Sequence, residues 1–149
     1  MSKKFGGKLA VVTGGSTGMG LATAKRFIQE GMDQVFITGR SQCALDAATA
    51  EIGKNVTAVQ GDVSSLADLD RLYVTVKKHE RKIDIIIANA GLARLASFGS
   101  FGTVDEKFFD LHFDANVKGL FYSVQKGLPL MKDGGSIILT KRSVLSNCA

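Results

Sequence analysis

A glycine-rich stretch near the start of the chain has residue types and spacing suited to binding phosphate. Its sequence is Thr-Gly-Gly-Ser-Thr-Gly-Met-Gly (residues 13–20), and it lies between an apolar run and a helical pattern that begins at Leu21. A strand that turns through glycines directly into a helix leaves backbone N–H groups free at the positive end of the helix dipole, where phosphate binds. A tight turn, close approach of a ligand and close packing of helix on strand are the expected reasons for glycine at Gly14, Gly18 and Gly20.

Three more loops with glycine or charged residues follow apolar segments. Gly39-Arg40 follows the run 34–38, Gly61-Asp62-Val63 follows 56–60, and Asn89-Ala90-Gly91 follows the almost wholly apolar run 83–88. The last run is typical of a parallel strand buried on both faces.

Helical patterns alternate with these strands. The first pattern covers 21–30 and ends at Gly31, the second covers 45–52, and the third covers 66–76 after the capping pair Ser65 and Asp68. The fourth is a long stretch from Val104 to Met131, which follows a capping box at 103–106. A fifth strand is expected at 136–140. This alternation predicts an α/β fold, a Rossmann-like doubly wound parallel sheet with strand order 3-2-1-4-5. The switch point between strands 1 and 4 would bring the loops 13–20 and 89–91 opposite each other, which favours a nucleotide ligand.

The composition indicates a globular protein with a single domain over residues 1–149, since 45% of the residues are hydrophobic and only one is proline. The net charge is +5, but the basic residues are scattered, so nucleic acid is not an expected partner. No apolar run approaches the roughly 18 residues that cross a membrane, and no signal peptide is expected. Cys43 and Cys148 lack metal-ligand spacing, so no metal site is expected. Two lone cysteines are typical of a reducing compartment, so a cytoplasmic location is expected.

Five motifs occur together along the chain: TGGSTGMG at 13–20, GDV at 61–63, ANAG at 88–91, NVKG at 116–119 and GSIIL at 135–139. In this order and spacing they resemble the classical short-chain dehydrogenases/reductases over nearly the whole chain. The resemblance implies an oxidoreductase that binds a nicotinamide dinucleotide and transfers hydride between it and a small alcohol or carbonyl substrate.

The resemblance also implies roles for individual residues. The backbone of the glycine-rich loop would hold the phosphates of the dinucleotide, Asp62 the adenine, and the loop at Asn89 the adenosine side and the central strand. The expected cofactor-binding residues are Thr13, Gly14, Ser16, Thr17, Gly18, Met19, Gly20, Arg40, Asp62, Val63, Asn89, Ala90 and Gly91.

The choice between NADP and NAD follows from the end of the second strand. An acid there would bind the ribose hydroxyls of NAD and repel a 2′-phosphate, but Gly39-Arg40 stands at this point. The permanently charged guanidinium of Arg40 suits a phosphate, with Ser16 as a second contact. The sequence therefore predicts NADP in preference to NAD. A methyltransferase would also need the absent acid, and a P-loop would need Gly-Lys-Ser/Thr where Met19-Gly20-Leu21 stands.

Catalysis in the family uses a Tyr, whose pKa a neighbouring Lys lowers, together with a Ser and an Asn. Asn116 matches the Asn, and Ser143 is the best match to the Ser, although the segment from the strand to Ser143 is one residue longer than usual and carries two cations. The Tyr and Lys should follow Ser143 on the next helix, beyond Ala149. The chain is therefore expected to be a C-terminally truncated member that lacks the family's last strands and helices.

Tyr122 and Lys126 have the YxxxK spacing but lie before the fifth strand. On one helix Tyr122 would point roughly 120° away from Asn116, so Tyr122 is expected to be a packing or interface residue. His79 and His112 have no evident partners and are expected at the surface or satisfied within a helix.

Truncation would leave the fifth strand as an apolar edge and would uncover part of the long helix, so self-association is expected. The homo-oligomer typical of the family is a second possible assembly. Two functions stay open at this point: an incomplete oxidoreductase chain that binds cofactor, and a dinucleotide-binding or partner-binding module without catalysis.

Overall fold

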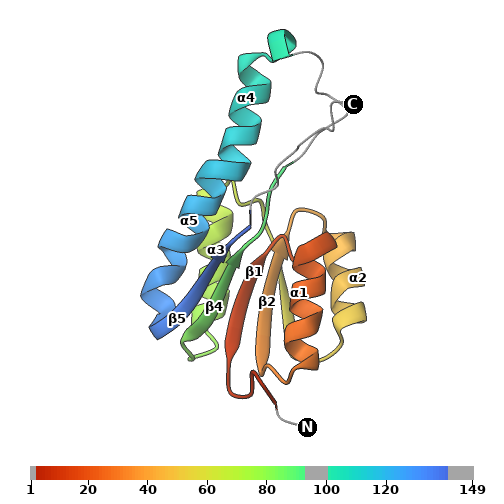
Figure 1. Ribbon diagram of the computed structural model, residues 1–149, viewed down its shortest axis with the longest axis vertical. Helices are drawn as coiled ribbons and strands as arrows, with labels where there is room; N and C mark the ends of the chain where they lie inside the picture. Colours follow the sequence, from red (N-terminus) through yellow and green to blue (C-terminus); the bar gives the residue numbers. More distant parts are fainter. Residues whose placement is uncertain (1–2, 93–100, 141–149) are drawn as a thin grey trace, which may run out of the picture.

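The strands form the sheet that the sequence predicts. A computed structural model describes residues 3–92 and 101–140 of the chain, and this part contains a parallel sheet with the order β3-β2-β1-β4-β5 (Figure 1). The winding direction reverses between β1 and β4, which is therefore the switch point. The strands are β1 (Leu9–Thr13), β2 (Gln34–Gly39), β3 (Val56–Gln60), β4 (Ile83–Ala88) and β5 (Met131–Leu139).

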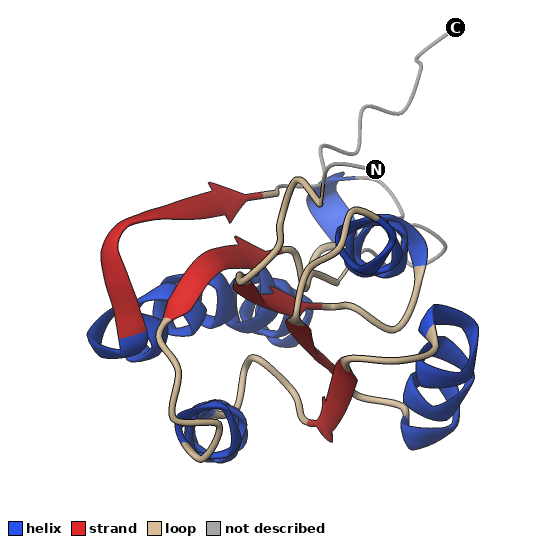
Figure 2. Cartoon of the chain, turned by 90° about the horizontal axis from the view of Figure 1, so that it is seen from below, coloured by secondary structure: helices blue, strands red, loops and turns tan. Residues whose placement is uncertain are grey.

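Helices cover both faces of this sheet, as the view along the strands in Figure 2 shows. Helices α1 and α2 pack on one face, and α3 and α5 pack on the other. The helical elements are α1 (Gly18–Gln29), α2 (Gln42–Ile52), α3 (Leu66–Lys77), α4 (Glu106–Phe113), the π-helical turn η3 (Asp114–Lys118) and α5 (Gly119–Gly127), with 3-10 turns η2 (Phe101–Thr103) and η4 (Leu128–Leu130).

Side chains of β1 alternate between two hydrophobic cores. Leu9 and Val11 join the core under α3, whereas Ala10 and Val12 join the core under α1 and α2. All four are fully buried, as a central parallel strand covered on both faces requires. The carboxyl end of β1 is level with its neighbours, because Thr13 is the register partner of both Thr38 and Ala88.

Helix α1 begins at Gly18, three residues earlier than the apolar pattern indicates. Thr17 is extended (φ −149°) and takes the N-cap position, so Gly18 and Gly20 already belong to the first turn. Glycines carry no side chain that contributes to an apolar period, so the pattern could begin only at Leu21. The first helical turn is thus part of the glycine-rich motif itself.

The expected long helix over 104–131 is divided, and this expectation was wrong in detail. Helix α4 begins at Glu106, with Asp105 as its cap: Asp105 Oδ1 accepts from the Phe108 N–H (2.7 Å). The capping box predicted from the sequence placed the N-cap at Thr103, two residues before the observed N-cap Asp105. The π-helical turn η3 divides the helix, the 3-10 turn η4 ends it, and β5 begins already at Met131. Apolar spacing continues through these changes, so the pattern alone did not reveal them.

Helix α5 packs closely on the sheet through small residues. A Cβ on Gly119 would lie 2.7 Å from Val63 Cγ2, and one on Gly127 would lie 2.6 Å from Ile86 Cδ1. Ser123, one turn from each, is fully buried. The helix can approach Val63, β4 and α3 this closely only because these positions lack larger side chains.

The opposite side of this helical column exposes apolar side chains, each four residues from the next, which we call the apolar stripe. Its members are between 48% and 58% exposed: Phe109, Phe113, Val117 and Phe121. On β5, Ile137, Ile138 and Leu139 are exposed as well. Uncovered apolar surface was expected on both elements, and the described residues have it.

Candidate functional site

A crevice lies at the carboxyl ends of the strands around the switch point. It consists of two adjoining hollows whose walls share Gly14, Thr17, Ala90 and Gly91. The β5-side hollow (about 160 Å³) extends to Asn116 and Thr140, and the β3-side hollow (about 150 Å³) extends to Ser16, Arg40 and Asp62. Every residue expected to bind the cofactor lines one of these hollows, except Thr13 and Gly20, which lie behind the wall.

The glycine-rich loop presents free backbone donors to the crevice. The first intrahelical hydrogen bond of α1 runs from the Leu21 N–H to the Thr17 carbonyl oxygen (3.2 Å), so the N–H groups before it have no acceptor within the helix. The first turn of α1 carries no acidic side chain. Gly18 has φ +57°, and a Cβ there would meet no atom within 4 Å, so its backbone faces open space. This turn can accept an anion such as a diphosphate.

Tight packing fixes this turn from behind. A Cβ on Gly20 would lie 2.1 Å from the Gly14 carbonyl oxygen, and a Cβ on Gly14 would lie 2.8 Å from Ala90 Cα. No real side chain tolerates either distance. Glycine is therefore required at Gly14 and Gly20 by the packing alone, as the sequence pattern predicts.

Thr13 and Asn89 join the two loops across the switch point. The backbone N–H groups of Asn89 and Ala90 both donate to Thr13 Oγ1 at 3.0 Å. The Asn89 side chain donates from Nδ2 to the Gly14 carbonyl oxygen (3.2 Å). Thr13 is buried, so both residues act here on the shape of the loop.

In the β3-side hollow the glycine-rich loop approaches the end of β2. A Cβ on Gly39 would lie 2.6 Å from Ser16 Oγ, so the hydroxyl of Ser16 lies against the residue before Arg40, and both Ser16 and Arg40 line this hollow. Arg40 is exposed, and its guanidinium takes part in none of the ion pairs of the described residues. Its backbone is held by Gln60 Nε2, which donates to the Arg40 carbonyl oxygen (3.0 Å). This cation is available to an anionic ligand.

Asp62 lies in a hydrogen-bonded turn after β3. Its Oδ1 accepts from both the N–H and the hydroxyl of Ser64 (2.9 and 2.7 Å). The Asp62 N–H donates to Asp68 Oδ2 (2.8 Å) at the start of α3, and this bond, together with Arg71 at 3.0 Å, lowers the pKa of Asp68 against the opposing effect of burial. Ser65 Oγ accepts from the Asp68 N–H (3.3 Å), which confirms the predicted cap. The ionised Asp68 thus fixes Asp62 in the wall.

Asn116 lies in the π-helical turn η3 and forms two hydrogen bonds with the backbone of one residue. Its Oδ1 accepts from the Leu92 N–H (2.7 Å), and its Nδ2 donates to the Leu92 carbonyl oxygen (2.9 Å). A π-helical turn is rare and often occurs at functional sites. Asn116 thereby fixes the chain that follows Gly91, besides lining the β5-side hollow.

Neither tyrosine of the sequence lies at the crevice. Tyr122 packs against the core under α3, and Lys126 forms an ion pair with Asp70 (2.5 Å), so the YxxxK spacing has a packing role here, as expected. Tyr73 is buried and donates to the Ser123 carbonyl oxygen, and burial raises its pKa. Ser143 lies outside the described residues, so its expected role stays a prediction.

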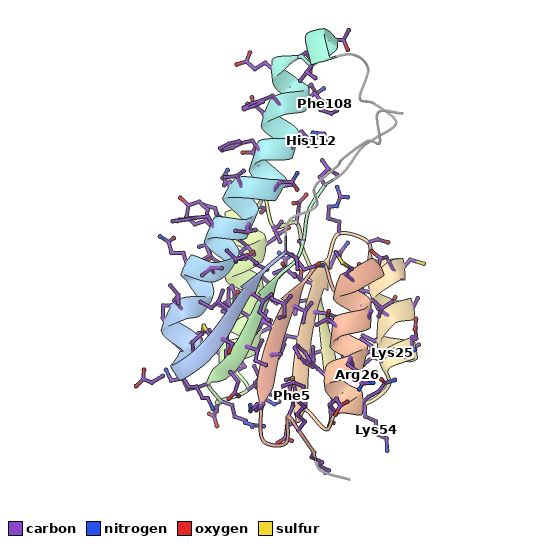
Figure 3. All side chains as sticks on the ribbon, in the orientation of Figure 1. Phe5, Lys25, Arg26, Lys54, Phe108 and His112 are labelled. Atoms are coloured by element: carbon purple, nitrogen blue, oxygen red, sulfur yellow. The ribbon has the colours of Figure 1, made fainter. Side chains whose placement is uncertain are left out.

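The two histidines differ in their surroundings. His79 is exposed, with its ring edge-on to Phe36 (5.6 Å), as expected. His112 stacks on Phe108 in α4 (4.0 Å), where Figure 3 labels both, and its Nδ1 lies 2.8 Å from the Phe108 carbonyl oxygen. Its Nε2 is buried without a hydrogen-bond partner among the described residues, so the expectation of a satisfied histidine holds only in part.

Sequence reasoning missed several residues that line the hollows, among them Leu92 and Thr140. Leu92 pairs with Asn116 through its backbone, and the sequence holds no signal for such a contact. Thr140 lines the β5-side hollow and donates to Asn89 Oδ1 (2.9 Å). It follows β5 directly, so its place after a parallel strand could have identified it.

Among the described residues, no group of histidine, cysteine and acidic side chains could hold a metal ion, and no helix is long and apolar enough to span a membrane. Cys43 is an exposed free thiol. Cys148 lies outside the described residues.

Known proteins share both the sequence and the fold of this chain. It is 50% identical to an oxidoreductase, asL5, of Sarocladium schorii over 143 residues, which are 95% of this chain and 56% of that protein. A short-chain dehydrogenase/reductase of Brucella melitensis, described as a glucose/ribitol dehydrogenase, matches with a TM-score of 0.85 at 25% identity, over 93% of this chain and 58% of that one.

A second solved structure, the 3-ketoacyl-(acyl-carrier-protein) reductase of Brucella melitensis complexed with NADH, matches with a TM-score of 0.79 at 31% identity, over 85% of this chain and 51% of that one. The chain thus spans about half the length of the relatives that it matches. The protein-family model for short chain dehydrogenases matches residues 8–146 of this chain. Together with the parallel sheet and its switch point, this match shows that the chain belongs to the short-chain dehydrogenase/reductase family.

Proposed function

We propose that the chain binds a nicotinamide dinucleotide across both hollows, as part of an oxidoreductase that acts on a small alcohol or carbonyl compound. The observation that carries this proposal is the row of free N–H groups at the start of α1, which lies where the two hollows meet. A diphosphate bound there would direct one nucleoside toward Asp62 and the nicotinamide toward Asn116. The bound nicotinamide would supply the hydride chemistry.

We further propose that NADP is preferred over NAD. Ser16 and Arg40 both line the hollow at the end of β2, and a 2′-phosphate of the adenosine ribose would meet there a hydroxyl and a guanidinium that forms no ion pair among the described residues. The Brucella melitensis reductase was solved with NADH, so the fold by itself does not require NADP. The choice depends on the residues at this strand end.

Titration of the chain with NADPH and with NADH, followed by nicotinamide fluorescence, tests both proposals. A hydrogen bond between charged groups contributes about 1.5–3 kcal/mol, and exposure of Arg40 favours the lower end, so Arg40→Asp is expected to weaken NADPH binding about tenfold. NADH should bind this variant at least as well as it binds the wild type. Arg26→Asp, the same charge change at the other end of α1, is the matched control and should alter neither affinity.

Two results would overturn the proposals. If neither dinucleotide binds at millimolar concentration, the crevice is not a cofactor site. If NADH binds the wild-type chain as tightly as NADPH or more tightly, the preference for NADP is wrong.

The proposal for catalysis is narrower than the proposal for binding. Asn116 would position the substrate side of the site through the loop at Leu92, and Ser143 would orient the substrate oxygen. A phenol that transfers the proton is not supplied by Tyr73 or Tyr122, which are both engaged elsewhere. We therefore expect this chain alone to bind cofactor without turnover, and NADPH-linked reduction of a carbonyl compound by the purified chain would contradict this.

A further inference from the structure

Thr140 completes a series of hydrogen bonds that runs from the end of β5 to the glycine-rich loop. Its hydroxyl donates to Asn89 Oδ1 (2.9 Å), and Asn89 Nδ2 donates to the Gly14 carbonyl oxygen (3.2 Å). The Thr140 backbone N–H donates to the Ala88 carbonyl oxygen (3.1 Å), which holds the residue beside β4. One side-chain amide therefore connects the ends of three strands.

The Asn89 amide has one correct orientation, because its two ends face unlike partners. The Gly14 carbonyl oxygen can only accept, so Nδ2 must face it and Oδ1 must face Thr140, where only a donor satisfies it. The Thr140 hydroxyl has a single proton and a longer second contact with the Ala88 carbonyl oxygen (3.4 Å). The shorter contact with Asn89 is the better bond.

The same amide contacts the phosphate-binding turn. A Cβ on Gly20 would lie 2.6 Å from Asn89 Nδ2, and a Cβ on Gly14 would lie 3.0 Å from it. The amide is thus packed against both ends of the turn that carries the free N–H groups. Any rotation or displacement of Asn89 would move this backbone.

We propose that Thr140 is a positioning residue for dinucleotide binding. It orients the Asn89 amide, Asn89 holds Gly14, and the free N–H groups of the first turn of α1 are thereby set for the diphosphate. The effect does not require Thr140 to touch the ligand. The inference rests on the proposed dinucleotide function and adds a residue that the family motifs of this chain do not include.

Calorimetric titration of the full 149-residue chain with ADP and with NADPH tests this inference. ADP carries the diphosphate without the nicotinamide, so it reports on the loop alone. Thr140→Val is expected to weaken ADP and NADPH binding by the same factor, about three- to tenfold, as expected for the loss of one hydrogen bond. Thr140→Ser retains the hydroxyl and should restore both affinities.

Thr57→Val is the matched control. The Thr57 hydroxyl also bonds a side-chain amide at 2.9 Å, that of Gln34, but on β3 at the far edge of the sheet. This variant loses a comparable hydrogen bond, so any general effect of destabilisation should appear in it too. Its affinities for ADP and NADPH should equal those of the wild type.

Unchanged ADP binding by Thr140→Val would overturn the inference. A loss confined to NADPH would also overturn it, because Thr140 would then contact the nicotinamide half directly. If Thr140→Val does not fold, Thr140→Ala removes the same donor and is judged by the same criteria. A wild-type chain that binds neither ligand refutes the proposed function, whereas wild-type binding that the Thr140 variants leave unchanged refutes only the role of Thr140.

Discussion

Asn116→Ala is expected to destabilise the chain by about 2–4 kcal/mol. The side chain hydrogen-bonds to both the N–H and the carbonyl oxygen of Leu92, at 2.7 and 2.9 Å, and Leu92 is only 9% exposed. Each backbone group left unpaired in a buried position costs about 1–3 kcal/mol, and the neighbouring hollow admits some water, so the sum lies below the maximum of this range.

Urea unfolding followed by circular dichroism measures this change. In a domain of this size about 1 kcal/mol shifts the midpoint of thermal unfolding by roughly 2–4 °C, so a decrease of about 5–15 °C is expected in a parallel thermal scan. Gln125→Ala, at an exposed position of α5, is the control and should stay within about 0.5 kcal/mol of the wild type. Asn116→Asp keeps an acceptor for the Leu92 N–H but places a second acceptor against its carbonyl oxygen, so at neutral pH it should not restore stability.

Two outcomes would refute this reasoning. A loss no greater than that of Gln125→Ala would mean that water replaces both bonds of Asn116 without cost. Full stability of Asn116→Asp at neutral pH would mean that the donor to the Leu92 carbonyl oxygen contributes nothing, and that the contact with Leu92 does not fix the end of the crevice.

Three further outcomes are expected. The pKa of Asp68 is lowered in the folded chain, so its ionised form contributes stability above about pH 4. This stability is lost as the pH falls through the lowered pKa. Asp68→Asn should remove this part of the acid dependence of unfolding and should increase proteolysis near Asp62. Gly127→Ala places a Cβ 2.8 Å from the Tyr73 hydroxyl oxygen and should cost about 1–3 kcal/mol in urea unfolding. The apolar stripe should cause concentration-dependent self-association in sedimentation velocity, and Phe121→Lys should reduce it; a monodisperse monomer at high concentration would contradict this.

The sheet was predictable because its strands are short apolar runs that end at glycines or charged residues. The bounds of β3 and β4 agree with the sequence pattern to the residue, and the alternation of strands with helices was sufficient for the order of the sheet. The helical column after Asp105 was not predictable in the same way. Its apolar period is continuous through η3, although the backbone hydrogen bonds change there from the α-helical to the π-helical pattern. This change has no signature in the types of the side chains.

The site was predictable as a set of loops but not as a network. Thr13 and Asn89 are 76 residues apart and Asn89 and Thr140 are 51 apart, so their hydrogen bonds depend on where side chains point after folding. Motifs identified Asn89 but not Thr140, because the family pattern leads past Thr140 to a serine further along the chain. The rule that ligands lie at the carboxyl ends of parallel strands selects Arg40, Asp62 and Asn89, and it selects Thr140 equally. That rule depends only on strands ending at one edge, so it identifies residues of the site even where the sequence departs from the family motif.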